Sequence, residues 1–186
     1  MKVFASKSES LGRVRERLEQ AATGTAFLPA SGVLSFLGTV TVAYPVTGVV
    51  IPAALLRPFQ WQLITLVCAL GSGLGATLLA EAAHLWGLAQ LEAWFLLTPD
   101  ASGWQEALDW VGHYGIFSLF LVAASPLPQT PALLLLGVAG HSIPGMFAAL
   151  FLGKVIKYGA VAWFSSRFPS RFGWSSDPVL RKESER

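Results

Sequence analysis

The residues with the clearest chemical potential are charged side chains inside apolar runs. Lys154 and Lys157 lie in the last long apolar run, and Glu81 and His84 lie near the end of an earlier one. Lysines three residues apart share one face of a helix. A charge at membrane depth is costly unless it pairs, lines a cavity or snorkels to the headgroups. The lysines could attract a lipid phosphate or another anion, with Glu81 tuning them. A structural ion pair, or snorkelling by Lys157, explains the pattern equally well.

Prolines and polar side chains interrupt two apolar runs, at "YPVTGVVIP" and at "SPLPQTP". Proline has no backbone donor and breaks the helix, so carbonyls near each interruption are left free. These carbonyls, with neighbouring hydroxyls and an amide, could form a polar path through an apolar shell. The candidate path residues are Pro45, Thr47, Gly48 and Pro52 in the first break, and Ser125, Pro126, Pro128, Gln129, Thr130 and Pro131 in the second.

The composition indicates that these runs lie in a membrane. The 186 residues are 53% apolar and only 13% charged, and the mean hydropathy is +0.55. Charged residues are absent from 20–56, 58–80 and 110–153. Each gap reaches the roughly 20 apolar residues that a membrane-spanning helix needs.

The arms on either side of each break are too short to cross a bilayer alone. Residues 49–56 would rise only about 12 Å as a helix, against a hydrocarbon core of about 30 Å. Residues 115–124 and 132–139 are similarly short. Broken backbone is tolerated at membrane depth only inside protein or beside water. We therefore predict two re-entrant hairpins, with ordinary proline-kinked helices as the alternative.

The same order of elements occurs twice along the chain. An amphipathic stretch precedes each hairpin, and an unbroken helix, at 61–87 and at 146–166, follows it. The predicted fold class is an all-α membrane protein with an inverted repeat of amphipathic helix, re-entrant hairpin and transmembrane helix. We divide it into an N-terminal amphipathic segment (1–25), a membrane domain (26–166, with repeats at about 8–87 and 103–166) and a cytoplasmic tail (167–186).

The distribution of charge predicts the orientation. All thirteen Lys and Arg residues lie near the chain ends, at Arg57, or at Lys154 and Lys157, whereas residues 88–114 contain acidic residues and no basic ones. By the positive-inside bias, both termini face the cytoplasm and the acidic centre faces out. We expect a multi-pass protein of a bacterial-type inner membrane.

Several kinds of chemistry find no support in the sequence. The single cysteine, Cys68, excludes an intrachain disulfide. No carboxylate or cysteine stands at ligand spacing from His113 or His141, so we expect no metal site. No nucleophile motif, phosphate-binding loop or nucleotide fingerprint occurs. We expect no enzyme activity, no cofactor and no nucleic-acid partner.

The two halves together resemble the DedA family, which belongs with SNARE-associated Golgi and VTT-domain proteins. The resemblance covers about residues 28–166 and rests on "PVTGVVIPAALLRPFQW", "LGSGLGATLLAEAAHLWG", "HYGIFSLFLVAASPLPQTPALLLLGVAG" and "LGKVIKYGAVAWF". Gly153, Lys154, Lys157 and Tyr158 match the family's glycine, basic, basic, tyrosine pattern. Thr47 or Gly48 stands where proton-coupled members have an acidic residue, and 123–125 lacks their arginine. These departures argue against coupled transport.

The resemblance implies lipid handling. We expect a flippase or scramblase for phospholipid or polyprenyl phosphate (undecaprenyl phosphate) headgroups, with membrane lipids as partners and homo-oligomer formation left open. Two alternatives are a proton-coupled transporter of a small solute or ion, using Glu81 and His84, and a non-catalytic membrane assembly factor.

Overall fold

The structure is a computed structural model that describes residues 24–87, 109 and 111–172. Within these ranges the chain is helical and contains no strand, which agrees with the predicted all-α class. The elements are α2 (Phe27–Val40), α3 (Thr47–Leu56), η1 (Pro58–Gln60), α4 (Trp61–Trp86), α7 (Ile116–Ala124), α8 (Thr130–Val138), α9 (Ile143–Arg167) and η2 (Pro169–Phe172).

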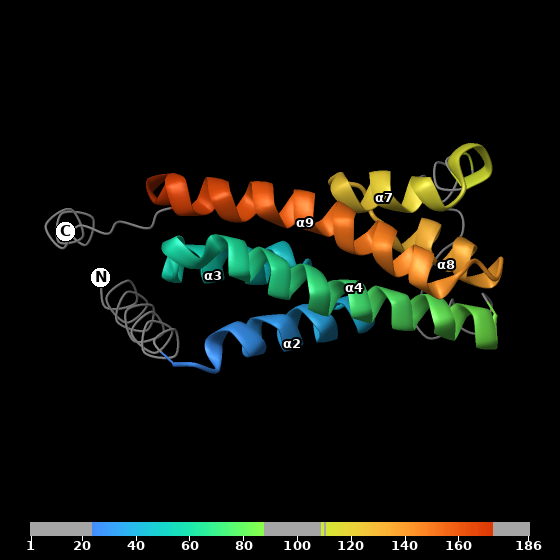
Figure 1. The fold of residues 1–186 in the computed structure, drawn as a ribbon, viewed down its shortest axis with the longest axis horizontal. Helices are drawn as coiled ribbons and strands as arrows, with labels where there is room; N and C mark the ends of the chain where they lie inside the picture. Colours follow the sequence, from blue (N-terminus) through green and yellow to red (C-terminus); the bar gives the residue numbers. More distant parts are fainter. Residues whose placement is uncertain (1–23, 88–108, 110, 173–186) are drawn as a thin grey trace, which may run out of the picture.

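Two long helices, α4 and α9, run the length of the bundle in opposite directions (Figure 1). The short helices form two hairpins, α2–α3 and α7–α8, which enter the bundle from opposite ends and turn back near its middle (Figure 1). The predicted unbroken helices at 61–87 and 146–166 correspond closely to α4 and α9. The tips of the two hairpins therefore meet beside the midpoints of the long helices.

Each hairpin packs on both long helices in the same manner. Its first helix lies along the long helix that follows in the chain, so α2 packs on α4 and α7 packs on α9. Its second helix lies against the other long helix, so α3 packs on α9 and α8 packs on α4. The two halves of the chain are thus interlocked, and neither hairpin is held by its own half alone.

Glycines permit the closest of these helix crossings. A methyl group on Gly71 of α4 would collide with the backbone carbonyl of Gly32 in α2. At the matching crossing, a Cβ on Gly153 of α9 would lie 2.7 Å from the Phe120 carbonyl oxygen of α7. Small residues let helix backbones approach in this way. Bulkier residues at Gly71 or Gly153 would push the hairpins off the long helices.

The first break is shorter than the sequence predicts. Residues 41–46 are non-helical, and Val42 has a φ of +53°, which is unusual for a β-branched residue. Thr47, Gly48 and Pro52 do not belong to this break, because α3 begins at Thr47 and contains the other two. Pro52 removes only one helical hydrogen bond, and the residue whose carbonyl loses that donor, Gly48, is exposed.

The second break covers residues 125–129 and matches the predicted proline-rich segment except at its end. Ser125 has an extended backbone. Its hydroxyl donates a hydrogen bond to the Val122 carbonyl at 3.0 Å and accepts one from the Leu127 amide. Thr130 and Pro131 lie in the first turn of α8 and not in the break. Proline is favoured there because the first-turn amides have no helical acceptor.

Two apolar clusters fill the ends of the bundle. On α4, Ile64, Cys68 and Ala69 belong to one cluster, and Ala76, Leu79, Ala80 and Ala83 belong to the other. A gap therefore separates the two clusters on α4. On α9 the corresponding gap lies between Leu150 of one cluster and Tyr158 of the other. Ser72 and Lys154 occupy these two gaps and are both buried. The middle of the bundle is therefore polar, with an apolar core on either side.

Some sequence predictions fall on residues outside the described ranges. They are the N-terminal amphipathic segment, most of the amphipathic stretch before α7, the acidic middle with Glu92, Asp100 and Glu106, and residues 173–186 of the tail.

Candidate functional site

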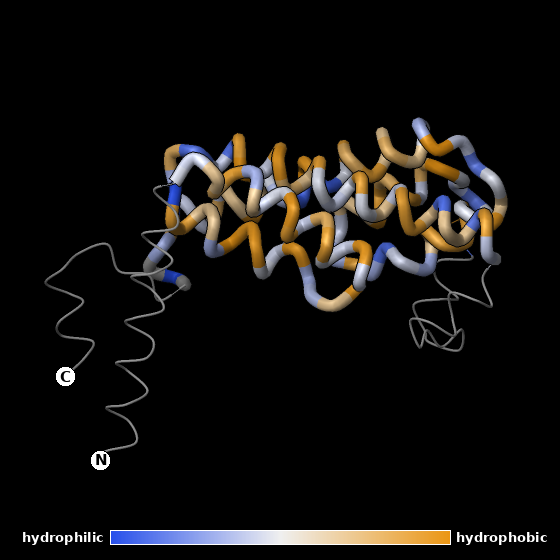
Figure 2. The backbone as a smooth tube through the Cα atoms, turned by 90° about the horizontal axis from the view of Figure 1, so that it is seen from below, coloured by the Kyte–Doolittle hydropathy of each residue, from blue (hydrophilic) through white to orange (hydrophobic). Residues whose placement is uncertain are grey.

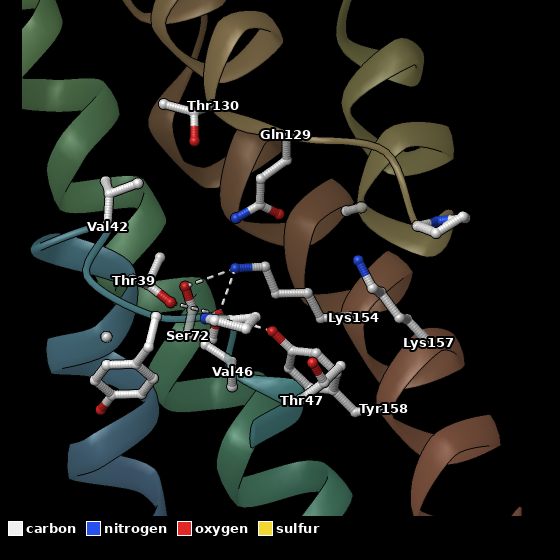
Figure 3. Close-up of a pocket in the computed structure, with 15 residues that line it drawn as sticks. Thr39, Val42, Val46, Thr47, Ser72, Gln129, Thr130, Lys154, Lys157 and Tyr158 are labelled. Carbon is white, nitrogen blue, oxygen red and sulfur yellow. Dashed lines mark hydrogen bonds between the residues drawn. The ribbon is translucent and has the colours of Figure 1, made fainter. Parts of the chain in front are cut away.

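A pocket of about 400 Å³ lies in the polar middle, between the two hairpin tips. The first tip contributes Thr39, Tyr44 and Thr47, among others, and the second contributes Gln129 and Thr130. The long helices form the remaining wall with Ser72, Lys154, Lys157 and Tyr158 (Figure 3). Both breaks and both long helices therefore contribute residues to this one pocket.

Lys154 is the most deeply buried charged side chain of the pocket, with 1% of its surface exposed. Its amino group donates two hydrogen bonds to α4, one to the Ser72 hydroxyl at 2.6 Å and one to the Ser72 carbonyl at 2.9 Å. An ammonium group has three donors, so one remains for another acceptor. Gln129 of the second tip points toward this amino group (Figure 3).

The Ser72 hydroxyl is the centre of a hydrogen-bond network. The Thr39 hydroxyl donates to the Ser35 carbonyl at 2.8 Å and is 2.7 Å from the Ser72 hydroxyl. Because the Thr39 hydrogen is used in α2, Ser72 donates to Thr39. The Ser72 oxygen then accepts from Lys154 and, at 3.2 Å, from the Tyr158 hydroxyl. This network ties the first hairpin to both long helices.

The same geometry argues against Ser72 as a nucleophile. A serine beside a lysine can be activated when the lysine accepts its proton. Here the Ser72 proton is directed at Thr39, and Ser72 is fully buried. Ser72 therefore holds the Lys154 amino group in position and presents no attacking oxygen to a substrate.

Lys157 adds a second cationic group to the pocket wall. It lies one helical turn after Lys154, on the same face of α9, and is half-buried. Within the described ranges the acidic residues are Glu81 and Asp109, and neither of them lines the pocket. Two amino groups, the hydroxyls of Thr47 and Thr130 and the Gln129 amide thus surround a space without a described carboxylate. This donor set suits an anion.

Tyr44 holds the first tip against α2. Its hydroxyl donates to the Leu34 carbonyl at 2.6 Å, and its ring covers Gly38, where a Cβ would lie 2.6 Å from the ring carbons. The ring fits only because Gly38 has no side chain. Tyr44 therefore fixes the rim of the pocket on the side of α2.

The structure brings together about half of the residues predicted from the sequence. The predicted residues that line the pocket are Pro45, Thr47, Pro126, Gln129, Thr130, Lys154 and Lys157. Ser125 and Pro128 belong to the second break without lining the pocket. Glu81 and His84 lie elsewhere, near the end of α4 beside the α8–α9 turn, where His84 approaches Gly140. They cannot act directly on a group held by the lysines.

Four polar or aromatic pocket residues were not among the predicted site residues: Thr39, Tyr44, Ser72 and Tyr158. A signal existed for two of them. Ser31, Ser35 and Thr39 recur every four residues and form a hydroxyl row along one face of α2. Ser72 follows Leu-Gly, as Lys154 does, so the two occupy corresponding positions in the two long helices.

Comparison with known proteins finds no matching family model, no matching characterised protein and no matching solved structure.

Proposed function

We propose that this chain is an integral membrane protein that moves the phosphate-bearing headgroup of a lipid across the bilayer through the pocket between the hairpin tips. The observation that carries the proposal is the position of Lys154. It is almost fully buried, it donates to Ser72, and it faces a pocket that Lys157 also lines. Phosphate oxygens would accept hydrogen bonds from these groups and offset the cost of burying them.

Membrane residence is supported by which apolar side chains are exposed. Two helices, Pro58–Trp86 and Ile143–Arg167, are long and apolar enough to cross a bilayer. A core helix of a soluble protein passes the same test but is mostly buried. The most apolar stretch of α4 is 67% buried, whereas that of α9 is only 28% buried. On α4 the exposed row is Leu63, Leu66, Leu70, Leu74 and Leu78. Hydrophobic residues follow most of the bundle's length, with many hydrophilic ones at its ends (Figure 2).

The arrangement of the hairpins supports an inverted-repeat architecture. Two inverted halves would form two hairpins that enter from opposite ends, each with its second helix packed on the long helix of the other half. Transporters of this design place their binding sites near the bilayer midplane, where broken helices meet. Membership of the DedA family remains part of the proposal and rests on the glycine, lysine, lysine, tyrosine pattern of α9, three of whose residues line or border the pocket.

Reconstitution in liposomes tests the proposal. Fluorescent phosphatidylglycerol is placed in both leaflets, and a membrane-impermeant quencher is added outside. We expect bleaching beyond one half with the protein, because inner-leaflet lipid reaches the outside. Bleaching that stops near one half, as in protein-free liposomes, would overturn the assignment. Lys154→Met is the test variant, because it removes the buried amino group of the pocket. Leu152→Ala, at an exposed apolar position of α9, is its control.

A transporter of a small free anion would use the same pocket chemistry. The two sources of an anion are separated in the same liposomes by loading them with inorganic phosphate and measuring its release. Phosphate release without lipid movement would assign the pocket to a free anion. Dependence of lipid movement on an imposed pH gradient would favour proton coupling, which passive scrambling does not require.

A further inference from the structure

A second hollow lies on α3 and α9, two of the helices that also line the polar pocket. It is an apolar groove of about 490 Å³ lined by Ile51 of α3 and by Ala160, Val161, Trp163 and Phe164 of α9. Its volume is within the roughly 300–1,000 Å³ of typical ligand sites. We call these five residues the chain groove.

The chain groove is aligned with the pocket by helical periodicity. Thr47 lines the pocket and Ile51 lines the groove, and residues four apart lie on one face of α3. On α9, Lys157 lines the pocket, and Val161 and Phe164 follow it by four and seven residues. The seam between α3 and α9 therefore changes from cationic and hydroxyl-bearing to apolar within about one helical turn.

The far end of the seam has aromatic and basic residues. The Phe164 and Phe168 rings lie 5.0 Å apart, and Trp163 packs edge-on to Phe168 at 6.4 Å. Arg167 directly precedes Phe168 in the sequence and is the basic residue in the last turn of α9. Aromatic and basic residues are typical of the membrane–water interface. The chain groove therefore leads from the polar middle of the bundle toward one membrane surface.

We propose that the chain groove holds one hydrocarbon chain of the lipid whose phosphate binds Lys154 and Lys157. The inference rests on the proposed function and adds the orientation of the ligand: the phosphate lies in the pocket and the chain lies along α3 and α9, toward Arg167. Because the bilayer is as apolar as the groove, the groove contributes shape and direction more than affinity. It favours an amphiphile with at least one extended chain over a short-chain phosphate.

Photolabelling tests the orientation. The full-length protein in phosphatidylcholine nanodiscs is incubated with an alkyl phosphate that carries a diazirine on its chain, irradiated and mapped by mass spectrometry. We expect labels on chain-groove residues in excess of the exposed leucines of α4, and loss of that excess in Lys154→Met. Labels spread evenly over α4 and α9 would overturn the proposal, and so would groove labelling that Lys154→Met leaves unchanged.

A filled groove provides the second test. Ala160 is exposed, so Ala160→Phe should fold while occupying the groove, and Ile156→Phe adds the same ring at an exposed α9 position outside it. We expect only Ala160→Phe to abolish groove labelling, with methyl phosphate binding unchanged. Equal labelling in both variants would overturn the chain site while leaving the phosphate pocket intact. If Lys154→Met does not weaken methyl phosphate binding, the proposed function itself fails. Cross-linking of Ala160→Cys between two copies would assign the groove to a protein interface instead.

Discussion

The amino group of Lys154 in α9 lies 2.6 Å from the hydroxyl of Ser72 in α4. Each residue directly follows the glycine at which the first helix of its own hairpin crosses the long helix, Gly153 for α7 and Gly71 for α2. The two halves of the chain therefore meet at corresponding positions. One half supplies the cation and the other supplies its hydrogen-bond acceptors.

The Ser72 hydroxyl should stabilise the fold by joining three helices. Ser72→Ala removes the shared partner of Lys154, Thr39 and Tyr158, so we expect the free energy of unfolding to fall by about 1–3 kcal/mol. Thermal unfolding in detergent measures this. Thr41→Ala removes an exposed hydrogen bond from the Thr41 hydroxyl to the Leu37 carbonyl at the end of α2 and should have little effect. A Ser72 variant as stable as the Thr41 variant would show that the network does not hold the helices together.

Lys154 should matter more for ligand binding than for stability. In Lys154→Met an apolar chain of similar length replaces the buried amino group, and the Ser72 hydroxyl keeps Thr39 and Tyr158 as partners, so no buried polar side chain is left unpaired. We expect alkyl phosphate binding to weaken at least about tenfold, equivalent to about 1.4 kcal/mol, while the unfolding temperature is maintained. Binding in nanodiscs and thermal unfolding are measured on the same preparation. A large loss of stability with unchanged binding would assign Lys154 a structural role only.

Two glycines should respond oppositely to alanine. Gly71→Ala places a methyl group against the Gly32 backbone and should destabilise the protein by about 1–3 kcal/mol. Gly48 lies in α3 with no atom within 4 Å of the added Cβ, so Gly48→Ala should stabilise by about 0.5–1 kcal/mol. Unfolding in detergent compares them. Similar effects of the two substitutions would contradict the close α2–α4 crossing.

Because α4 and α9 run in opposite directions, the residues just before these two helices should lie on opposite sides of the membrane. Phe59 precedes α4 and is 99% exposed, and Ser142 precedes α9 and is exposed. Cysteines at these positions should react with a membrane-impermeant maleimide from opposite sides. The native Cys68 is fully buried and should stay unlabelled. Labelling of Phe59→Cys and Ser142→Cys from one side would contradict the two-span topology.

The positions of the helices could be predicted from local sequence. Prolines at Pro45, Pro126 and Pro128 mark where the apolar runs break, because proline acts on its own and the preceding residues. Uninterrupted apolar residues similarly predicted α4 and α9. Five residues were misassigned to the breaks, because threonine, glycine and proline are all tolerated near the start of a helix, where few helical bonds are lost. They are Thr47, Gly48, Pro52, Thr130 and Pro131.

The composition and order of residues determined by themselves that the chain forms apolar helices, where two of those helices break, and that Lys154 and Lys157 share a face. Only the tertiary structure decided that α3 crosses to α9 and α8 to α4, that Lys154 binds Ser72 across 82 positions of sequence, and that Glu81 and His84 lie away from the pocket. Helix periodicity and proline chemistry act within a few residues, so the sequence records them directly. The choice of partner helix depends on which surfaces fit together, and that is settled only when the glycine crossings and the buried polar groups are satisfied at the same time.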